Sequence, residues 1–113
     1  MTQFFLGMYQ PEGVMPDPDT LGPIMQQMGE LVGELAAKGA LVFGNGFDQA
    51  HGTQLVQPDG TTDSRNFHPG STQLGGVTIV DLPDEASAAD VARRMAAITG
   101  LPIEVRVFAA ARG

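Results

Sequence analysis

Alternation of apolar and polar residues predicts the strands of one sheet. In residues 2–9 the side chains of Phe4, Leu6 and Met8 recur at every second position, which is the period of a half-buried strand, and the run is rich in aromatic residues. We expect this strand to be a central one. Three further runs have the length and composition of strands, namely residues 40–43, 74–81 and 103–107.

Apolar residues at helical spacing predict two helices between these strands. Their stripes comprise Leu21, Ile24, Met25, Met28, Leu31, Val32, Leu35 and Ala36, and then Ala88, Val91, Ala92, Met95 and Ile98. Asp19 or Thr20 is expected to cap the first helix, and Gly39 to end it. Asp84 is expected to cap the second helix, which should end at Gly100.

Glycine and proline mark the connections. The run Gly44-Asn45-Gly46 is expected to break the second strand. Pro58-Asp59-Gly60 has the residues of a tight turn and predicts a hairpin between strands at 53–57 and 61–63. The pair Gly75-Gly76 allows a bulge or a close backbone approach at the entry to the strand that follows.

The order strand, helix, strand, hairpin, strand, helix, strand predicts an α+β fold. It is the split βαβ pattern of ferredoxin-like domains with an inserted β-hairpin, and 113 residues suit a single domain over 1–113. Two helices can cover only one face of such a sheet. The opposite face is expected to carry Phe5, Tyr9, Thr78, Glu104, Arg106 and Phe108. Because this mixture is too apolar for water and too polar for an ordinary core, it favours a homodimer interface that encloses a cavity.

Composition excludes several classes of function. With 13 acidic and 6 basic residues the net charge is -7, which opposes binding to nucleic acid or to anionic membranes. The absence of cysteine excludes disulfides, thiolate nucleophiles and thiolate metal sites. No segment resembles a signal peptide or a membrane span, so a cytoplasmic location is the default expectation, and no cofactor is indicated.

His68 is the first candidate for chemistry, because an imidazole changes protonation near neutral pH. It lies five residues after Asp63, with Arg65 between them. We therefore predict that, in an enzyme, His68 would transfer a proton, Asp63 would orient the imidazole and Arg65 or Arg106 would hold an anionic group of the substrate. The alternative is a polar loop whose charges meet only solvent.

The cavity that binds a small molecule is predicted to be lined by side chains from the loop and from the uncovered face. These are Phe5, Tyr9, Phe67, His68 and Arg106. A metal site made by His51, His68 and either Asp48 or Asp63 is a weaker alternative, because the sequence contains no HxH, HxxxH or HExxH spacing. We predict no metal.

Several motifs together resemble the YCII-related domain family, and more closely its branch named after a DGPF motif. They are the opening strand ending in Tyr9, the segment ELAAKGALVFGNG at 34–46, the PDG hairpin, QLGG at 73–76 leading into VTIVDL, and the terminal IEVRV at 103–107. The resemblance spans nearly the whole chain. It implies a ferredoxin-like dimeric α/β barrel, in which two sheets pack face to face around a cavity.

The chain also departs from the family pattern. The signature tetrapeptide aligns with Ser64-Arg65-Asn66-Phe67, where only the phenylalanine is kept, and His68-Pro69-Gly70-Ser71 follows. Some relatives carry a histidine near the start of the first helix that is thought to act with an aspartate. Residues 21–28 contain no histidine, so that dyad does not carry over.

Three hypotheses for function follow, and the third, an oxygenase of the cofactor-free type seen on similar barrels, rests on fold analogy alone. The first is a homodimer whose cavity binds a small, anionic molecule, with histidine-mediated acid–base chemistry of a lyase or isomerase type if the protein is an enzyme. The second is a non-catalytic module for dimerisation or protein interaction. A cavity of roughly 300 Å³ or more with converging polar groups would favour the first hypothesis, and an interface filled by side chains would favour the second.

Overall fold

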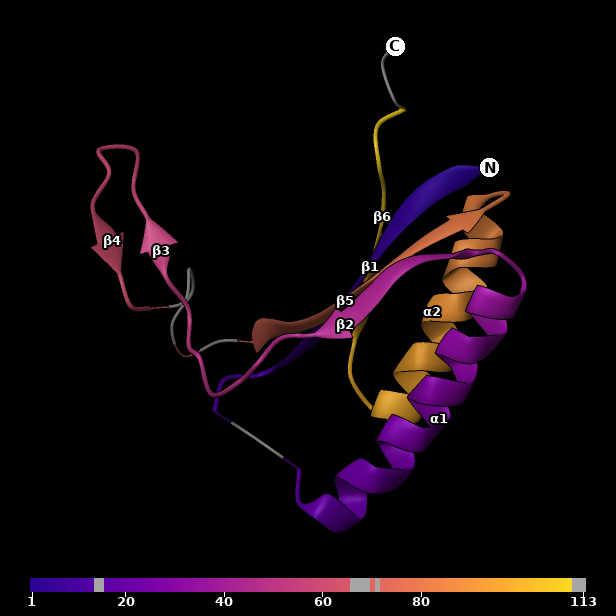
Figure 1. The fold of residues 1–113 in the computed structure, drawn as a ribbon, viewed down its shortest axis with the longest axis horizontal. Coiled ribbons are helices and arrows are strands. Elements are labelled where there is room, and N and C mark those ends of the chain that lie inside the picture. The colour runs from indigo at the N-terminus through magenta and orange to yellow at the C-terminus, as the bar shows by residue number, and fades with distance from the viewer. Residues whose placement is uncertain (14–15, 66–69, 71, 111–113) are drawn as a thin grey trace.

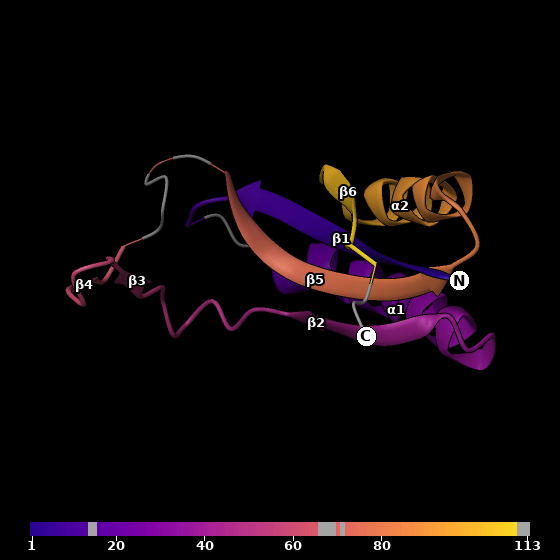
Figure 2. The ribbon, with the colours of Figure 1, turned by 90° about the horizontal axis from the view of Figure 1, so that it is seen from above.

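A four-stranded antiparallel sheet with two helices on one face forms the body of the protein (Figures 1 and 2). The computed structural model describes residues 1–13, 16–65, 70 and 72–110. The elements are β1 (Thr2–Pro11), α1 (Pro18–Ala37), β2 (Leu41–Gly46), β3 (Leu55–Val56), β4 (Thr62–Asp63), β5 (Thr72–Leu82), α2 (Glu85–Thr99) and β6 (Ile103–Val107). The predicted α+β class is confirmed.

The strand order in the sheet is β2-β5-β1-β6, so the two long strands β1 and β5 are central. Pairing runs from Thr2 opposite Leu82 to Pro11 opposite Thr72, with a register shift between Met8 and Tyr9. Met8 lies opposite Gly76 and Tyr9 lies opposite Leu74, which leaves Gly75 as the extra residue of a bulge. The bulge expected at the two glycines is therefore confirmed.

The core lies between the sheet and the helices. It consists of Phe4, Leu6, Leu31, Leu35, Ala40, Val80, Ala88, Ala92 and Met95. Thr78 belongs to this covered face as well, since it is buried and lies opposite Leu6. Its expected place on the uncovered face was wrong, because the strand alternates with Val80 buried and Ile79 on the other side.

Local capping chemistry sets the helix ends. Asp17, not Asp19 or Thr20, caps α1 by accepting a hydrogen bond from the Thr20 backbone at 2.8 Å. The difference arises because Pro18 fits the first helical position, where no backbone donor is needed. Asp84 caps α2 as predicted, with the Ser87 amide 2.8 Å from its carboxylate.

The glycines at 44–46 do not break β2. They continue it, with Gly44, Asn45 and Gly46 opposite Thr78, Val77 and Gly76 of β5. A Cβ on Gly76 would lie only 3.3 Å from the Asn45 carbonyl oxygen, so this end of the strand pair relies on small residues for its close approach.

Substitution of the core residue Leu31 tests this arrangement. Leu31 is 1% exposed, and we expect Leu31→Ala to lower the free energy of unfolding by about 2–5 kcal/mol through lost packing. Met25, on the same helix, is 64% exposed, so Met25→Ala should change the stability by less than about 0.5 kcal/mol. Urea unfolding followed by circular dichroism measures both. Equal losses for the two variants would contradict the position of the core.

Candidate functional site

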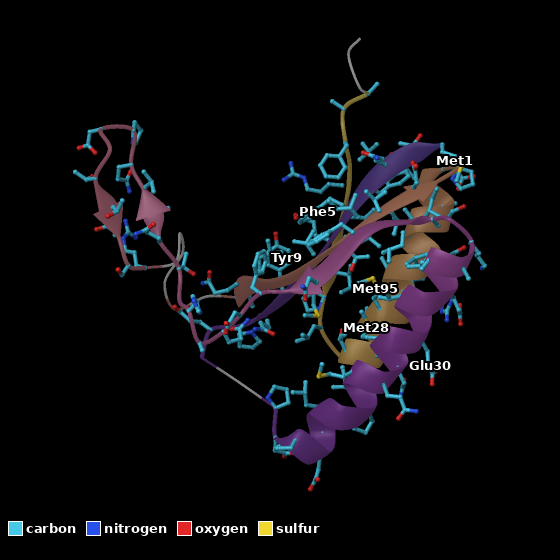
Figure 3. All side chains as sticks on the ribbon, in the orientation of Figure 1. Met1, Phe5, Tyr9, Met28, Glu30 and Met95 are labelled. Atoms are coloured by element: carbon cyan, nitrogen blue, oxygen red, sulfur yellow. The ribbon has the colours of Figure 1, made fainter. Side chains whose placement is uncertain are left out.

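The face of the sheet away from the helices, which we call the open face, is where most of the predicted binding residues lie. Cross-strand register places Phe43, Ile79, Phe5 and Arg106 in one row across all four strands. Asn45, Val77, Gly7 and Glu104 form the next row. Figure 3 shows Phe5 and Tyr9 on this side, with Met28 and Met95 on the helix side.

The open face has an apolar middle and a more polar edge. Phe5, Val77 and Ile79 are half-buried although no helix covers them, whereas Phe43 at the β2 edge is 55% exposed. Strand alternation puts Phe108, just after β6, on the same side as Arg106. An aromatic and aliphatic surface of this kind, unpaired in one chain, is typical of an interaction site.

Gly7 leaves room for the Phe5 ring because it has no side chain of its own. A Cβ at position 7 would lie 2.6 Å from the Phe5 ring and 3.1 Å from a Leu74 methyl group. The ring therefore lies over the backbone of its own strand, which explains why Gly7 is buried on a face without helices.

Tyr9, Glu104 and Arg106 form the polar part of the open face. The Tyr9 hydroxyl donates a hydrogen bond to the Glu104 carboxylate at 3.0 Å. This hydrogen bond raises the pKa of Tyr9, partial burial and the negative charge of Glu104 add to the effect, and the positive charge of Arg106 opposes it. Tyr9 is therefore a neutral hydrogen-bond donor at physiological pH.

The Arg106 guanidinium has no hydrogen-bond or ion-pair partner among the residues that the structure describes. An arginine can bind a carboxylate or phosphate through two parallel hydrogen bonds. Beside it lie the Phe5 ring, in the opposite register position, and the tyrosine hydroxyl bound to Glu104. The cluster can thus hold an anionic group next to an aromatic surface.

Asp63 and Arg65 lie elsewhere, at the β3–β4 hairpin. The Arg65 Nε atom is 3.6 Å from an Asp63 carboxylate oxygen, and both side chains are half-exposed. Such a pair stabilises a surface weakly and leaves both groups accessible. The hairpin stands apart from the sheet in Figures 1 and 2, so one chain does not bring Asp63 and Arg65 to the cluster of Phe5, Tyr9 and Arg106.

The remaining predicted residues, Phe67 and His68, lie outside the described residues, so acid–base catalysis by His68 stays a prediction. His51 forms an exposed pair with Asp48, with 3.2 Å between its Nδ1 atom and the carboxylate. Within the described ranges no three histidine, aspartate or glutamate side chains gather as a metal site would require.

A hollow of about 430 Å³ lies away from all the predicted site residues. Glu85, Ala86 and Ala89 of α2 and Val105 of β6 line it. Its lining has one charged side chain and small apolar ones, and so lacks the converging polar groups of a specific ligand site. We therefore place the candidate site on the open face.

Sequence reasoning placed Glu104 on the uncovered face with Arg106 but gave it no role in the site, and it did not assign Gly7 or Phe43 to the site. Strand alternation indicates the shared face of Glu104 and Arg106, but it does not indicate the hydrogen bond that Glu104 accepts. Its partner Tyr9 is 95 residues away in the chain, and only the register of β1 and β6 brings the two together.

The comparison of the sequence with models of known protein families finds no match, and the search for similar curated proteins finds none either. Among the described helices, neither is long and apolar enough to cross a membrane.

The titration of Tyr9 tests the polar cluster. Tyr9 is the only tyrosine and the chain has no tryptophan, so the phenolate absorbance reports this residue alone. We expect its midpoint to lie above that of the urea-unfolded chain. Glu104→Gln should lower the midpoint and Arg106→Ala should raise it further, because the two charges act in opposite directions.

Circular dichroism at each pH would show that the chain remains folded during this titration. A midpoint in the folded protein equal to that of the unfolded chain would contradict the Tyr9–Glu104 hydrogen bond.

Proposed function

We propose that the chain is a ferredoxin-like domain of the YCII-related type that forms a homodimeric α/β barrel through its open face and binds a small anionic molecule between the two sheets. The observation that carries this proposal is an Arg106 guanidinium with no hydrogen-bond or ion-pair partner among the described residues, on a face where neither helix covers Phe5, Phe43 and Ile79. The strand order β2-β5-β1-β6, antiparallel throughout, supports the ferredoxin-like assignment.

The exposed surface of one chain supports a dimer. A compact monomer of 11.8 kDa exposes about 5,900 Å² by the general scaling of surface with mass, and this chain exposes 7641 Å². The excess, about 1,700 Å² per chain, would amount to about 3,400 Å² for two copies, which is within the range of obligate homodimer interfaces.

The chemistry of the open face favours an anionic ligand with an apolar part. Arg106 supplies a bidentate donor, Tyr9 supplies a phenol, and Phe5 supplies an aromatic surface. Enclosure between two sheets would exclude water and strengthen the attraction between the guanidinium and the anion. The net charge of -7 does not oppose a small ligand held by one local cation.

A second candidate function is a dimerisation module without a ligand. The position of the 430 Å³ hollow favours it, because this hollow lies at α2 and β6 and touches no residue of the open face. The two candidates differ in the dimer: the first requires a cavity of roughly 300 Å³ or more beside Arg106, and the second requires an interface filled by side chains.

Substitution on the open face tests the dimer. In sedimentation equilibrium we expect the mass of two chains, and Phe43→Asp should give the mass of one, because it places a charge in the apolar contact. Met25→Asp, at a similarly exposed position on α1, should leave the protein dimeric. A monomeric unmodified chain would refute the proposal.

Benzoate is a suitable probe of the ligand site because it joins a carboxylate to an aromatic ring. We expect calorimetry to detect benzoate binding that Arg106→Ala weakens roughly ten-fold or more, whereas Arg93→Ala, which removes an arginine already paired with Asp90, has no effect. Neutral benzamide should bind more weakly than benzoate. Equal binding of benzoate to both variants would assign no ligand role to Arg106.

A further inference from the structure

The β3–β4 hairpin cannot be stabilised by its own contacts alone. Its strands pair at Leu55 with Asp63 and at Val56 with Thr62. The turn is closed by backbone hydrogen bonds from Gln57 to Thr61 and from Gly60 to Gln57, and by the Asp59 carboxylate, which accepts hydrogen bonds from Thr61. A two-stranded hairpin is at best marginally stable in water unless it packs on another surface.

Of the described helices and strands, none packs extensively against the hairpin. Figures 1 and 2 both show it beyond the end of the sheet where β2 ends and β5 begins, and Figure 1 shows it raised on the side away from the helices. Phe47, on the segment that leads to it, is 54% exposed, and Val56 within it is 61% exposed. While the hairpin extends into water, these apolar side chains contribute no free energy of burial.

The dimensions of the chain agree with an extended arm. A compact chain of 113 residues has a radius of gyration of about 13 Å, whereas this chain has one of 15.5 Å and extents of 46 × 41 × 19 Å. Part of the surface excess of the single chain therefore belongs to the hairpin and not to the open face.

We propose that the β3–β4 hairpin is an arm that packs on a second copy of this chain and brings its Asp63 and Arg65 to the partner's open face. This inference rests on the proposed dimer. In a two-fold dimer the copy that covers the open face lies on the side to which the hairpin is raised. Each hairpin then runs beside the other subunit, so the two subunits exchange their hairpin arms reciprocally.

The exchange explains why the predicted site is divided in one chain. Phe5, Tyr9 and Arg106 lie on the open face, whereas Asp63 and Arg65 form a half-exposed pair on the hairpin. Arrival of the partner's Arg65 beside Arg106 would place two guanidinium groups around one ligand. The ligand class that this site fits is a dianion, such as a dicarboxylate or a phosphate monoester, whose oxygens bind both guanidinium groups, and without ligand the carboxylates of Glu104 and Asp63 balance the two positive charges.

A matched pair of substitutions separates the arm from the rest of the interface. Val56→Asp on the hairpin should raise the dissociation constant of the dimer roughly ten-fold or more, as loss of an apolar interface anchor does. Val107→Asp makes the same change at a position 54% exposed on the helix side of β6, and it should leave the dissociation constant unchanged. Equal dimer dissociation constants for Val56→Asp and the unmodified chain would overturn the proposal that the arm packs on the partner.

Contact with the partner can be observed directly because the chain has no cysteine. A Val56→Cys chain without ¹⁵N carries a nitroxide and is mixed with the unmodified chain labelled with ¹⁵N. Because only the unmodified chain gives amide signals, any broadening of a signal comes from a nitroxide on the other subunit. We expect broadening at Tyr9 and Arg106. Gln54→Cys, at a second exposed position before β3, provides an independent label in case the first weakens the dimer.

The outcomes are distinguishable. If the protein is a dimer but neither label broadens the Tyr9 and Arg106 amide signals of the other subunit, the exchanged arm is overturned. The proposed dimer then still stands. A sample that is monomeric without any label would overturn both. Broadening at Tyr9 and Arg106 that disappears on dilution below the dissociation constant supports the exchanged arm.

Discussion

The whole structure depends on the fact that successive side chains of a strand point to opposite faces of the sheet. In β1 and β5 both faces carry apolar residues: Phe4, Leu6 and Val80 on one side, and Phe5, Val77 and Ile79 on the other. Two helices bury the first set completely and leave the second without a cover. The chain thus has apolar surface for two cores and helices for one. In the proposed dimer, a partner surface on the open face would resolve this imbalance.

The same constraint explains how much the sequence could predict. Alternation is local, so the strands, the uncovered face and the shared position of Phe5, Tyr9 and Arg106 on it follow from the pattern of residues alone. Capping and turn chemistry are local too, which is why Asp84, Gly39 and the hairpin turn at Gly60 were correctly predicted. The cap of α1 was predicted a few residues too late, at Asp19 or Thr20 in place of Asp17. Thr78 was assigned to the wrong face of its strand.

Features that depend on neighbouring strands could not be predicted in this way. Gly44 and Gly46 look like strand breakers in the sequence, but they allow β2 to approach the glycine bulge of β5. Gly7 looks like a weak point in β1, but it makes room for the Phe5 ring. The hydrogen bond between Tyr9 and Glu104 requires the β1–β6 register, and the direction of the hairpin is set by no local pattern.

The division of the polar residues into two groups links the fold to the proposed function. Arg106, the proposed anion-binding residue, lies on the open face, whereas Arg65 and Asp63 lie at the hairpin beyond the end of the sheet. In a reciprocal dimer, one contact would cover the apolar face and assemble the binding site, so folding of the dimer and formation of the site would be coupled.

The most direct test is an isotope-filtered nuclear Overhauser experiment on a mixture of ¹³C-labelled and unlabelled chains. It detects only contacts between different subunits. The account predicts intermolecular signals from the methyl groups of Val77 and Ile79 to aromatic protons of the other copy, since these methyls lie in the middle of the open face. Intermolecular signals confined to the helix side, or none at millimolar concentration, would contradict it.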